Sequence, residues 1–160
     1  MSAHPDDQTP LARLSEAGMH HIVGYQLAQA AITTTQVFAE QVGAPFDLRP
    51  VEFTMLSLIH ENPDVSARQL ARALAVTPPN ITVWIDRLEK RGLVKRERST
   101  TDARAQHIRA TTAGAALARK SVNRLRESEG EAMASLSTAE RAMLVELLHK
   151  VARCRKRAPG

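Results

Sequence analysis

The sequence predicts a mostly helical α+β fold with a single β-hairpin. Apolar residues recur at steps of three and four along most of the chain, as they do on the buried face of an α-helix. The exception is a stretch near residues 93–111, where two short segments typical of strands flank a polar loop. Of the 160 residues, 43% are hydrophobic and only 3% aromatic, so we expect one globular unit with an aliphatic core.

Long helices are expected at both ends of the chain. Residues 1–15 form a flexible polar tail, and a weakly charged helical pattern then begins near residue 16 and ends in a connection by residue 48. A second helical region covers residues 112–152, and residues 153–160 form a basic tail. The two helical regions carry more apolar surface than the unit between them can cover, which predicts that they dimerise.

The middle of the chain, residues 50–111, contains two short helices joined by a tight turn, followed at once by the hairpin. Ser66 and Gln69 form a capping box that opens the first of these helices. Gly92 ends the second, because glycine readily takes the left-handed conformation that follows a helix end. This order of elements predicts a helix-turn-helix with a β-hairpin wing.

The charge of the chain is unevenly distributed. Residues 1–76 carry 4 basic and 8 acidic residues, whereas residues 77–110 carry 8 basic and 4 acidic ones. A basic block of this kind indicates a polyanionic partner. The major groove of DNA admits a helix and a β-ribbon can reach the next minor groove, so we expect DNA. The alternative is an unrelated pair of hairpins with a solvated, charged face.

The sequence around the second short helix resembles the MarR family of bacterial transcriptional regulators. Residues 85–94 (IDRLEKRGLV) resemble the end of that family's recognition helix, residues 102–104 (DAR) its wing signature, and residues 111–114 (TTAG) the exit into a long helix. The resemblance extends from about residue 17 to 152. It implies a winged helix-turn-helix homodimer that represses or activates transcription and is often released from DNA by a small aromatic or phenolic ligand.

The candidate DNA contacts follow from this resemblance and from side-chain chemistry. Asn80 can hydrogen-bond adenine edges, and Thr82 or Val83 can contact a thymine methyl group. Family members often carry Arg at the position of Val83, so strong guanine readout is not expected there. Arg104 is the candidate for a narrow minor groove, with Asp102 orienting it. The other candidates, which include phosphate contacts, are Ser66, Gln69, Thr77, Pro79, Arg87 and Arg98.

Trp84 has two interpretations. It shares a helix face with Ile81 and Leu88, which favours packing in the core. The alternative is a platform on which single-stranded bases stack.

A ligand pocket is expected between the first helix and the DNA-binding unit, where the MarR family often has one. His20 and His21 are adjacent, and Tyr25 lies close in sequence. Imidazole both donates hydrogen bonds and changes charge near neutral pH, so these residues can bind a carboxylate or phenolate. The alternative is that one His is satisfied in the core and the other is solvated. The remaining ligand candidates are Arg49, Phe53, Ser57 and His60.

Several functional classes are not expected. The chain has no glycine-rich phosphate loop and no nucleophile motif, which argues against an enzyme. No cofactor or metal is expected, because the histidines lack helical ligand spacing. The single cysteine, Cys154, excludes an internal disulfide. We expect a cytoplasmic protein with no membrane segment that joins the nucleoid when bound to a palindromic operator. The alternatives are an effector-independent or architectural DNA-binding protein, or a regulator responding to metal or oxidation.

Overall fold

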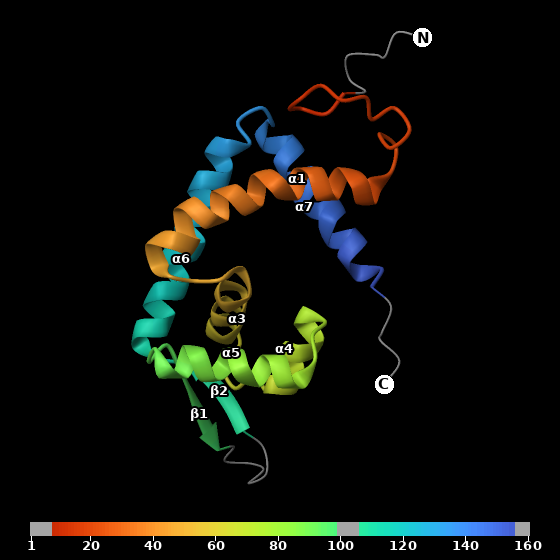
Figure 1. Ribbon diagram of the computed structural model, residues 1–160. Helices are drawn as coiled ribbons and strands as arrows, with labels where there is room; N and C mark the ends of the chain where they lie inside the picture. The colour runs from red at the N-terminus through yellow and green to blue at the C-terminus, as the bar shows by residue number, and fades with distance from the viewer. Residues whose placement is uncertain (1–7, 99–105, 156–160) are drawn as a thin grey trace.

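The structure is a computed structural model that describes residues 8–98 and 106–155. In Figure 1, α3, α4, α5 and the hairpin lie together in the lower part of the view, and α1 crosses the upper part. The long α6 joins the two levels and packs against α3, α1 and η2. The predicted winged helix-turn-helix with long terminal helices is confirmed. In order, the elements are α1 (Val23–Phe38), the π-helix η2 (Ala39–Gly43), α2 (Ala44–Phe46), α3 (Pro50–Glu61), α4 (Ala67–Leu74), α5 (Pro78–Lys90), β1 (Val94–Arg98), β2 (Gln106–Ala110), α6 (Thr112–Ala132) and α7 (Thr138–Arg153).

The main core lies inside the unit formed by α3, α4, α5 and the hairpin. Ile81, Ile85 and Leu88 on one face of α5 are at most 1% exposed and pack with aliphatic side chains from α3, α4 and β2. Trp84 is partly buried against this same core, so the packing interpretation of the lone tryptophan is confirmed. A smaller cluster at the end of α1 consists of Phe38, Val42 and Leu48.

The hairpin is joined to the rest of the unit at the start of β1 and at the middle of β2. β1 pairs antiparallel with β2 over their whole length. The amide of Ile108 in β2 also donates to the carbonyl of Val65 at 2.9 Å, which adds an isolated bridge ahead of α4. Gly92, with φ of 68°, makes the left-handed turn between α5 and β1, as the sequence predicted.

The first helix begins at Val23, so the prediction of a helix from residue 16 is wrong. The residues before α1 form turns, in which the amide of His20 donates to the carbonyl of Glu16 at 2.8 Å. The side chain of Gln26 donates to the carbonyl of His20 at 3.0 Å. The Gln26 bond occupies the carbonyl of His20, which a continuous helix would offer to the amide of Gly24. At its other end α1 passes into η2, and α2 ends at Asp47, which is left-handed with φ of 49°.

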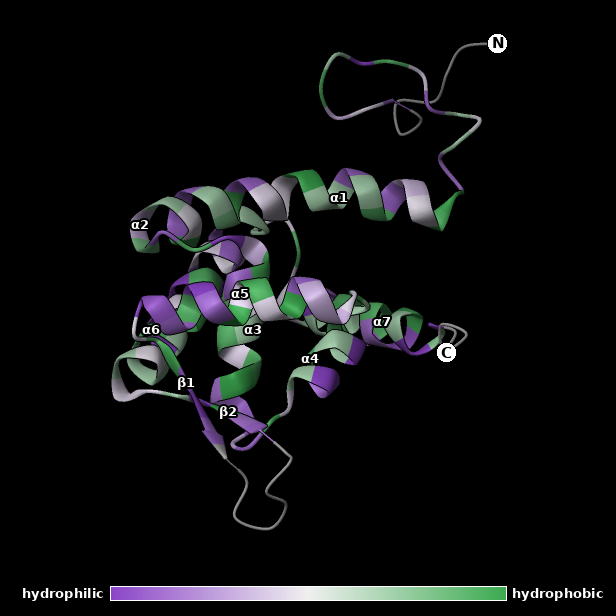
Figure 2. Cartoon of the chain, turned by 60° about the horizontal axis from the view of Figure 1, so that its bottom comes forward, coloured by the Kyte–Doolittle hydropathy of each residue, from purple (hydrophilic) through white to green (hydrophobic). Residues whose placement is uncertain are grey.

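The last helix, α7, buries none of its side chains within the single chain. Its periodic apolar residues lie on one face, and within one chain their exposed fractions range from 39% for Leu144 to 55% for Met143. Figure 2 shows the corresponding hydrophobic bands on α7 and similar bands on α1. The residues of this α7 face are Met143, Leu144, Leu147, Leu148 and Val151. Within the described ranges, no helix combines the length and apolar character needed to cross a bilayer.

Candidate nucleic-acid interface

Local hydrogen bonds set the start of α4, the first helix of the helix-turn-helix. The amide of Gln69 donates to the hydroxyl of Ser66 at 3.3 Å, and the amide of Ser66 donates to the side-chain oxygen of Gln69 at 2.9 Å. This is the predicted capping box. Thr77 stands at the cap of α5, but its hydroxyl accepts no capping bond. Pro79 has no amide hydrogen to donate to that hydroxyl, and the amide of Asn80 donates to the backbone carbonyl of Thr77 at 3.1 Å instead.

The recognition helix α5 has two different faces. Ile81, Ile85 and Leu88 are buried, whereas Pro79, Asn80, Thr82 and Val83 are exposed. Val83 is 56% exposed. The hydroxyl of Thr82 donates to the carbonyl of Pro78 at 3.3 Å, and the residue is exposed. The structure therefore brings these four candidate DNA contacts together on one surface.

Arg87, on the same helix, has a partner that the sequence did not indicate. Its Nε lies 3.2 Å from Oε1 of Glu52 in α3, and the Glu52 side chain is only 2% exposed. The other carboxylate oxygen accepts the backbone amide of Arg49 at 2.9 Å. Glu52 thus connects the start of α3 to the recognition helix, and it holds Arg87 at the edge of the interface.

The wing is fixed to the recognition helix by a second group of charges. Arg96 in β1 bonds both Glu89 and Asp86 of α5, and its backbone amide donates to Glu89 at 3.3 Å. These contacts set the direction of the hairpin relative to α5. Asp86, which lies on the polar side of α5, is therefore occupied by the wing.

The far side of the hairpin carries a third charged group. Arg109 in β2 bonds the carboxylate of Asp64 at 2.5 Å and lies 3.2 Å from Glu97. The hydrogen bond from Lys95, at 2.5 Å, lowers the pKa of Glu97, and the positive charges of Lys95 and Arg109 lower it further. The hydrogen bond to Asp64 raises the pKa of Arg109.

Much of the basic block is therefore paired within the protein. The charge count alone overestimates the positive charge that this block presents to a partner. Further exposed basic side chains lie outside this block on α4, at Arg68 and Arg72. Within the described part of residues 77–110, the basic side chains with an acidic neighbour are Arg87, Arg91, Lys95, Arg96 and Arg109.

The wing tip falls outside the described residues. Asp102 and Arg104 lie there, so their predicted roles rest on the sequence alone. Arg98 is the last residue of β1, where it pairs in register with Gln106.

Two of the ligand candidates near the start of α1, Tyr25 and His20, contact an acid of the same chain. The Tyr25 hydroxyl donates to Glu16 at 2.6 Å, and Nδ1 of His20 lies 3.5 Å from the same carboxylate. Glu16 is 6% exposed. The hydrogen bond to Glu16, with smaller contributions from burial and from the Glu16 charge, raises the pKa of Tyr25. His21 is exposed, and its ring lies edge-on to His20 with centroids 5.5 Å apart.

The remaining ligand candidates form a separate group. Phe53 packs against Phe38 with ring centroids 5.5 Å apart. Phe38 is thirteen residues beyond Tyr25 on a continuous helix, a separation of about 20 Å. Within one chain the structure therefore does not bring the predicted ligand residues into one pocket. Ser57, His60 and Arg49 belong to α3 or its start, where the Ser57 hydroxyl is buried without a hydrogen-bond partner.

The remaining candidate sites are the Cys154 thiol and a possible metal site. Cys154 is exposed at the end of α7, where its thiol contacts the carbonyl of Lys150 at 3.5 Å. Among residues 8–98 and 106–155, no three His, Cys, Asp or Glu side chains gather in a way that could hold a metal ion.

Comparison with known proteins identifies the family of this chain. The sequence pattern of the MarR family matches residues 48–105. Over 151 residues the chain is 32% identical to a proposed transcriptional regulatory protein for the hcr operon of Thauera aromatica, covering 94% of this chain and 90% of that protein.

Solved structures agree with this match. The transcriptional repressor CouR, bound to a 23-mer DNA duplex, superposes with a TM-score of 0.76 at 28% identity, over 87% of this chain and 98% of CouR. A mutant MarR from E. coli complexed with operator DNA superposes with a TM-score of 0.70 at 25% identity, over 81% and 92% of the two chains. The chain belongs to the MarR family of transcriptional regulators, which are non-enzymatic DNA-binding proteins.

Proposed function

We propose that the chain is a dimeric repressor that binds a palindromic operator and is released by a small aromatic acid or phenol. The observation that carries the DNA-binding part is the two-faced helix α5, whose apolar side is buried while Asn80, Thr82 and Val83 face solvent beside the hairpin. Structures of CouR on a DNA duplex and of E. coli MarR on operator DNA support this use of the fold.

In this proposal the solvent-facing residues of α5 read bases. Asn80 hydrogen-bonds an adenine edge, and Thr82 and Val83 contact thymine methyl groups in the major groove. Other contacts fix the register on the phosphates. Arg104 enters the minor groove and Asp102 orients it. The positioning contacts are Ser66, Gln69, Thr77, Pro79, Arg87 and Arg98.

The dimer is proposed from unpartnered apolar surface. In α7, Leu147 is 49% exposed and Val151 48%, and in α1 Ile32 is 53% exposed. Contiguous apolar faces of this extent mark interaction sites on soluble proteins. A second copy carries the same faces, so a two-fold pairing of residues 16–48 and 112–152 covers both at once. The winged units are then held at a fixed spacing.

The DNA-binding part is tested on an operator selected from random duplexes with the full-length protein. Half-sites about 34–36 Å apart are expected for a two-fold dimer. Asn80→Ala should weaken operator binding by about 1–3 kcal/mol and relax the preference at one base pair. Glu61→Gln, an exposed residue at the end of α3 outside the candidate DNA contacts and the proposed dimer region, is the control. Equal loss of affinity for operator and scrambled DNA in Asn80→Ala would contradict base readout by this residue.

The effector is proposed to bind at the N-terminal end of α1. Tyr25 and His20 are donors suited to a carboxylate or phenolate, with His21 beside them. Arg49, Phe53, Ser57 and His60 form the second candidate region on α3, where the unpartnered Ser57 hydroxyl supports a polar contact. A ligand releases DNA only by binding more tightly to the form of the dimer that does not fit the operator.

The test is a titration of aromatic acids and phenols into the protein–operator complex. Wild type is compared with His20→Ala, His21→Ala and Tyr25→Phe. Weaker release in these variants supports the site at α1, and equal release in all four excludes it. The effector-independent alternative is favoured by one observation: Glu16 already satisfies Tyr25 and His20. That alternative holds if no aromatic compound changes operator affinity at millimolar concentration.

A further inference from the structure

Two helix ends meet at one side chain in this fold. The elements α1, η2 and α2 follow one another without a break from Val23 to Phe46, and Asp47, the cap of α2, is left-handed. Arg91 is the cap of α5, and the left-handed Gly92 follows it. The last carbonyls of a helix have no partner within that helix, so both ends need donors from elsewhere.

Arg91 supplies donors at both ends. Its backbone amide donates to the carbonyl of Arg87 within α5 at 3.2 Å. Its guanidinium donates to the carbonyl of Phe46 at 3.0 Å and to the carbonyl of Asp47 at 2.5 Å. The fork of the guanidinium suits two neighbouring acceptors, and a positive charge is favourable at the negative end of a helix dipole. One side chain therefore joins the end of the recognition helix to the end of the α1–η2–α2 helix.

The acceptors of Arg91 are backbone carbonyls rather than a carboxylate. The Asp47 carboxylate lies 4.0 Å from the Arg91 guanidinium, and the Asp47 side chain is 98% exposed. An ion pair that solvent reaches this freely contributes little. The position of Arg91 is therefore set by the path of the backbone at the end of α2.

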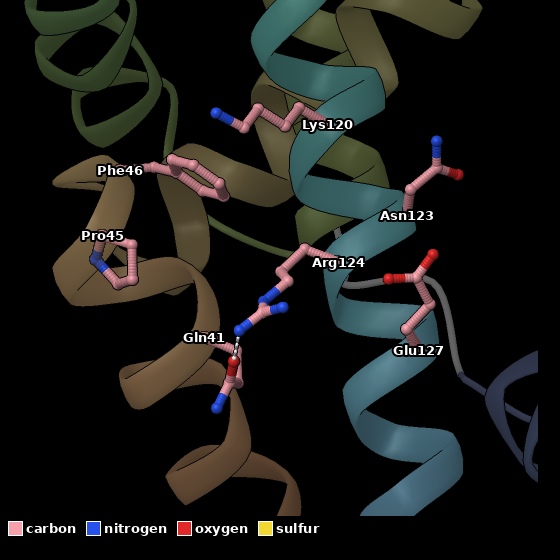
Figure 3. Close-up of a pocket in the computed structure, with 7 residues that line it drawn as sticks. All are labelled: Gln41, Pro45, Phe46, Lys120, Asn123, Arg124 and Glu127. Atoms are coloured by element: carbon pink, nitrogen blue, oxygen red, sulfur yellow. Dashed lines mark hydrogen bonds between the residues drawn. The ribbon is translucent and has the colours of Figure 1, made fainter.

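The other side of the same corner is held by α6. Figure 3 shows Lys120 extending from α6 toward Phe46, and Arg124 extending toward Gln41. Nζ of Lys120 lies 5.1 Å from the centroid of the Phe46 ring, and the Arg124 guanidinium donates to the side-chain oxygen of Gln41 at 2.5 Å. The corner is thus attached to α6 independently of Arg91. Loss of the Arg91 side chain should release the end of α5 and leave the corner in place.

We propose that Arg91 is a positioning residue that fixes the direction of α5 relative to the α1–η2–α2 helix, and thereby the half-site spacing that the dimer accepts. In the dimer proposed above, the partner holds α1 and α7. The spacing of the two recognition helices then depends on how each α5 is joined to its own α1–η2–α2 helix. The spacing rests on the proposed dimeric DNA-binding function, whereas the contact made by Arg91 does not, so the two are measured separately.

The contact is tested without DNA, by amide hydrogen exchange of the full chain followed by NMR. The amide of Leu48 donates to the carbonyl of Gly43 at 3.1 Å and closes the corner that Arg91 holds. This amide should exchange at least fivefold faster in Arg91→Ala, because the corner opens more often. The rate should stay unchanged in Lys90→Ala, which removes a neighbouring exposed cation of α5. It should also stay unchanged in Asp47→Asn, which keeps the carbonyl and tolerates the left-handed backbone.

The spacing is tested on the selected operator and on two derivatives with one base pair added or removed between the half-sites, a shift of about 3.4 Å. Wild type should prefer the selected spacing at least tenfold. In Arg91→Ala this preference should fall to threefold or less, while the affinity for a single half-site stays within twofold of wild type. Arg91→Lys keeps the charge without the fork and should give an intermediate preference. It carries both tests if Arg91→Ala does not fold, and wild-type values in Arg91→Lys would then overturn the proposal.

Four results with a folded Arg91→Ala would overturn the proposal. They are an unchanged exchange rate at Leu48, a wild-type spacing preference, a reduced affinity for the single half-site, and an equal loss of affinity at every spacing. The last result, if Lys90→Ala shows it too, would mean that Arg91 only adds positive charge near the DNA. A wild-type protein that binds no DNA would reject the proposed function and leave the exchange result standing.

Discussion

Nε of Arg87 lies 3.2 Å from the carboxylate of Glu52, a side chain that is 2% exposed in the core of the DNA-binding unit. Arg87 itself is 43% exposed at the edge of the recognition helix. The Arg87 guanidinium thus contacts the buried Glu52 carboxylate on one side. Its other side faces the position where we expect a DNA phosphate. The pair explains how α5 is anchored to α3 without an apolar contact at this point.

Replacing Arg87 by Ala should lower the free energy of unfolding, because it leaves the buried Glu52 carboxylate with only the Arg49 amide as a partner. We expect a loss of about 1–2 kcal/mol, less than for a fully buried pair because solvent reaches Arg87. Urea unfolding measures it. In the double variant with Glu52→Gln, part of the loss should be recovered. Unchanged stability of Arg87→Ala with loss of DNA binding would show that Arg87 acts only on the phosphates.

Gly114 at the start of α6 cannot carry a side chain. A Cβ built there would lie 1.8 Å from the carbonyl oxygen of Leu93. Gly114→Ala should therefore cost about 3 kcal/mol or more, since the clash is with backbone. Gly24→Ala is the matched control: its Cβ would meet nothing within 4 Å in α1, and stability should stay constant or rise by up to about 1 kcal/mol. Thermal unfolding of both variants checks the contrast, and equal midpoints would contradict it.

The dimer proposed here depends on the apolar face of α7. Leu147→Glu should weaken dimerisation at least tenfold, because burying a leucine contributes about 1.5–3 kcal/mol and a charge would now face the partner. Light scattering should then detect a particle of 17.6 kDa, the mass of one chain. His149→Glu, which adds the same charge on the other side of α7, should remain dimeric. A wild-type protein of 17.6 kDa would reject the dimer itself.

Local features of this fold could be predicted from the sequence because their causes are local. The capping boxes at Ser66 and Ser137 each join residues three apart, and both are present. Gly92 has the left-handed backbone that its position after a helix required. The solvent-facing side of α5 followed from periodicity, since the apolar residues that anchor the helix lie on the other side.

The features that the sequence did not reveal join distant residues. Glu52 and Arg87 are far apart in the chain, and an acid among apolar residues of a helix carries no local sign of its partner. The start of α1 was placed too early because the periodic pattern continues through residues 16–22, where Glu16 instead accepts the Tyr25 hydroxyl. The apolar face of α7 was predicted correctly as a pattern, but a pattern does not state whether the same chain or a second copy covers it.

The capping box of α7 makes this helix sensitive to acid. Hydrogen bonds from the side chain and the backbone of Ser137 lower the pKa of Glu140 from its ordinary value of 4.5. A lowered pKa in the folded state stabilises α7 above pH 4.5, and the contribution is lost as the pH falls through the folded pKa. In Ser137→Ala, carboxyl NMR titration should show the pKa of Glu140 shifted up toward 4.5, whereas Ser137→Thr should preserve the shift. An unchanged pKa in Ser137→Ala would contradict the assignment.

The contact between Tyr25 and Glu16 makes the opposite prediction for alkaline pH. The hydrogen bond to Glu16 is the largest cause that raises the pKa of Tyr25 above 10, followed by burial and by the Glu16 charge. A raised pKa in the folded state means that the contribution to stability is complete below pH 10 and is lost as the pH rises through the folded pKa.

Tyr25 is the single tyrosine of the chain, so the ultraviolet absorbance of the phenolate reports this group alone. Glu16→Gln should move the midpoint down toward 10, because the acceptor loses its charge. Glu40→Gln, an exposed acid farther along the same helical segment, should leave the midpoint in place. A wild-type midpoint at or below 10 would show that the hydroxyl does not donate to Glu16 in solution, and would leave Tyr25 free for an effector.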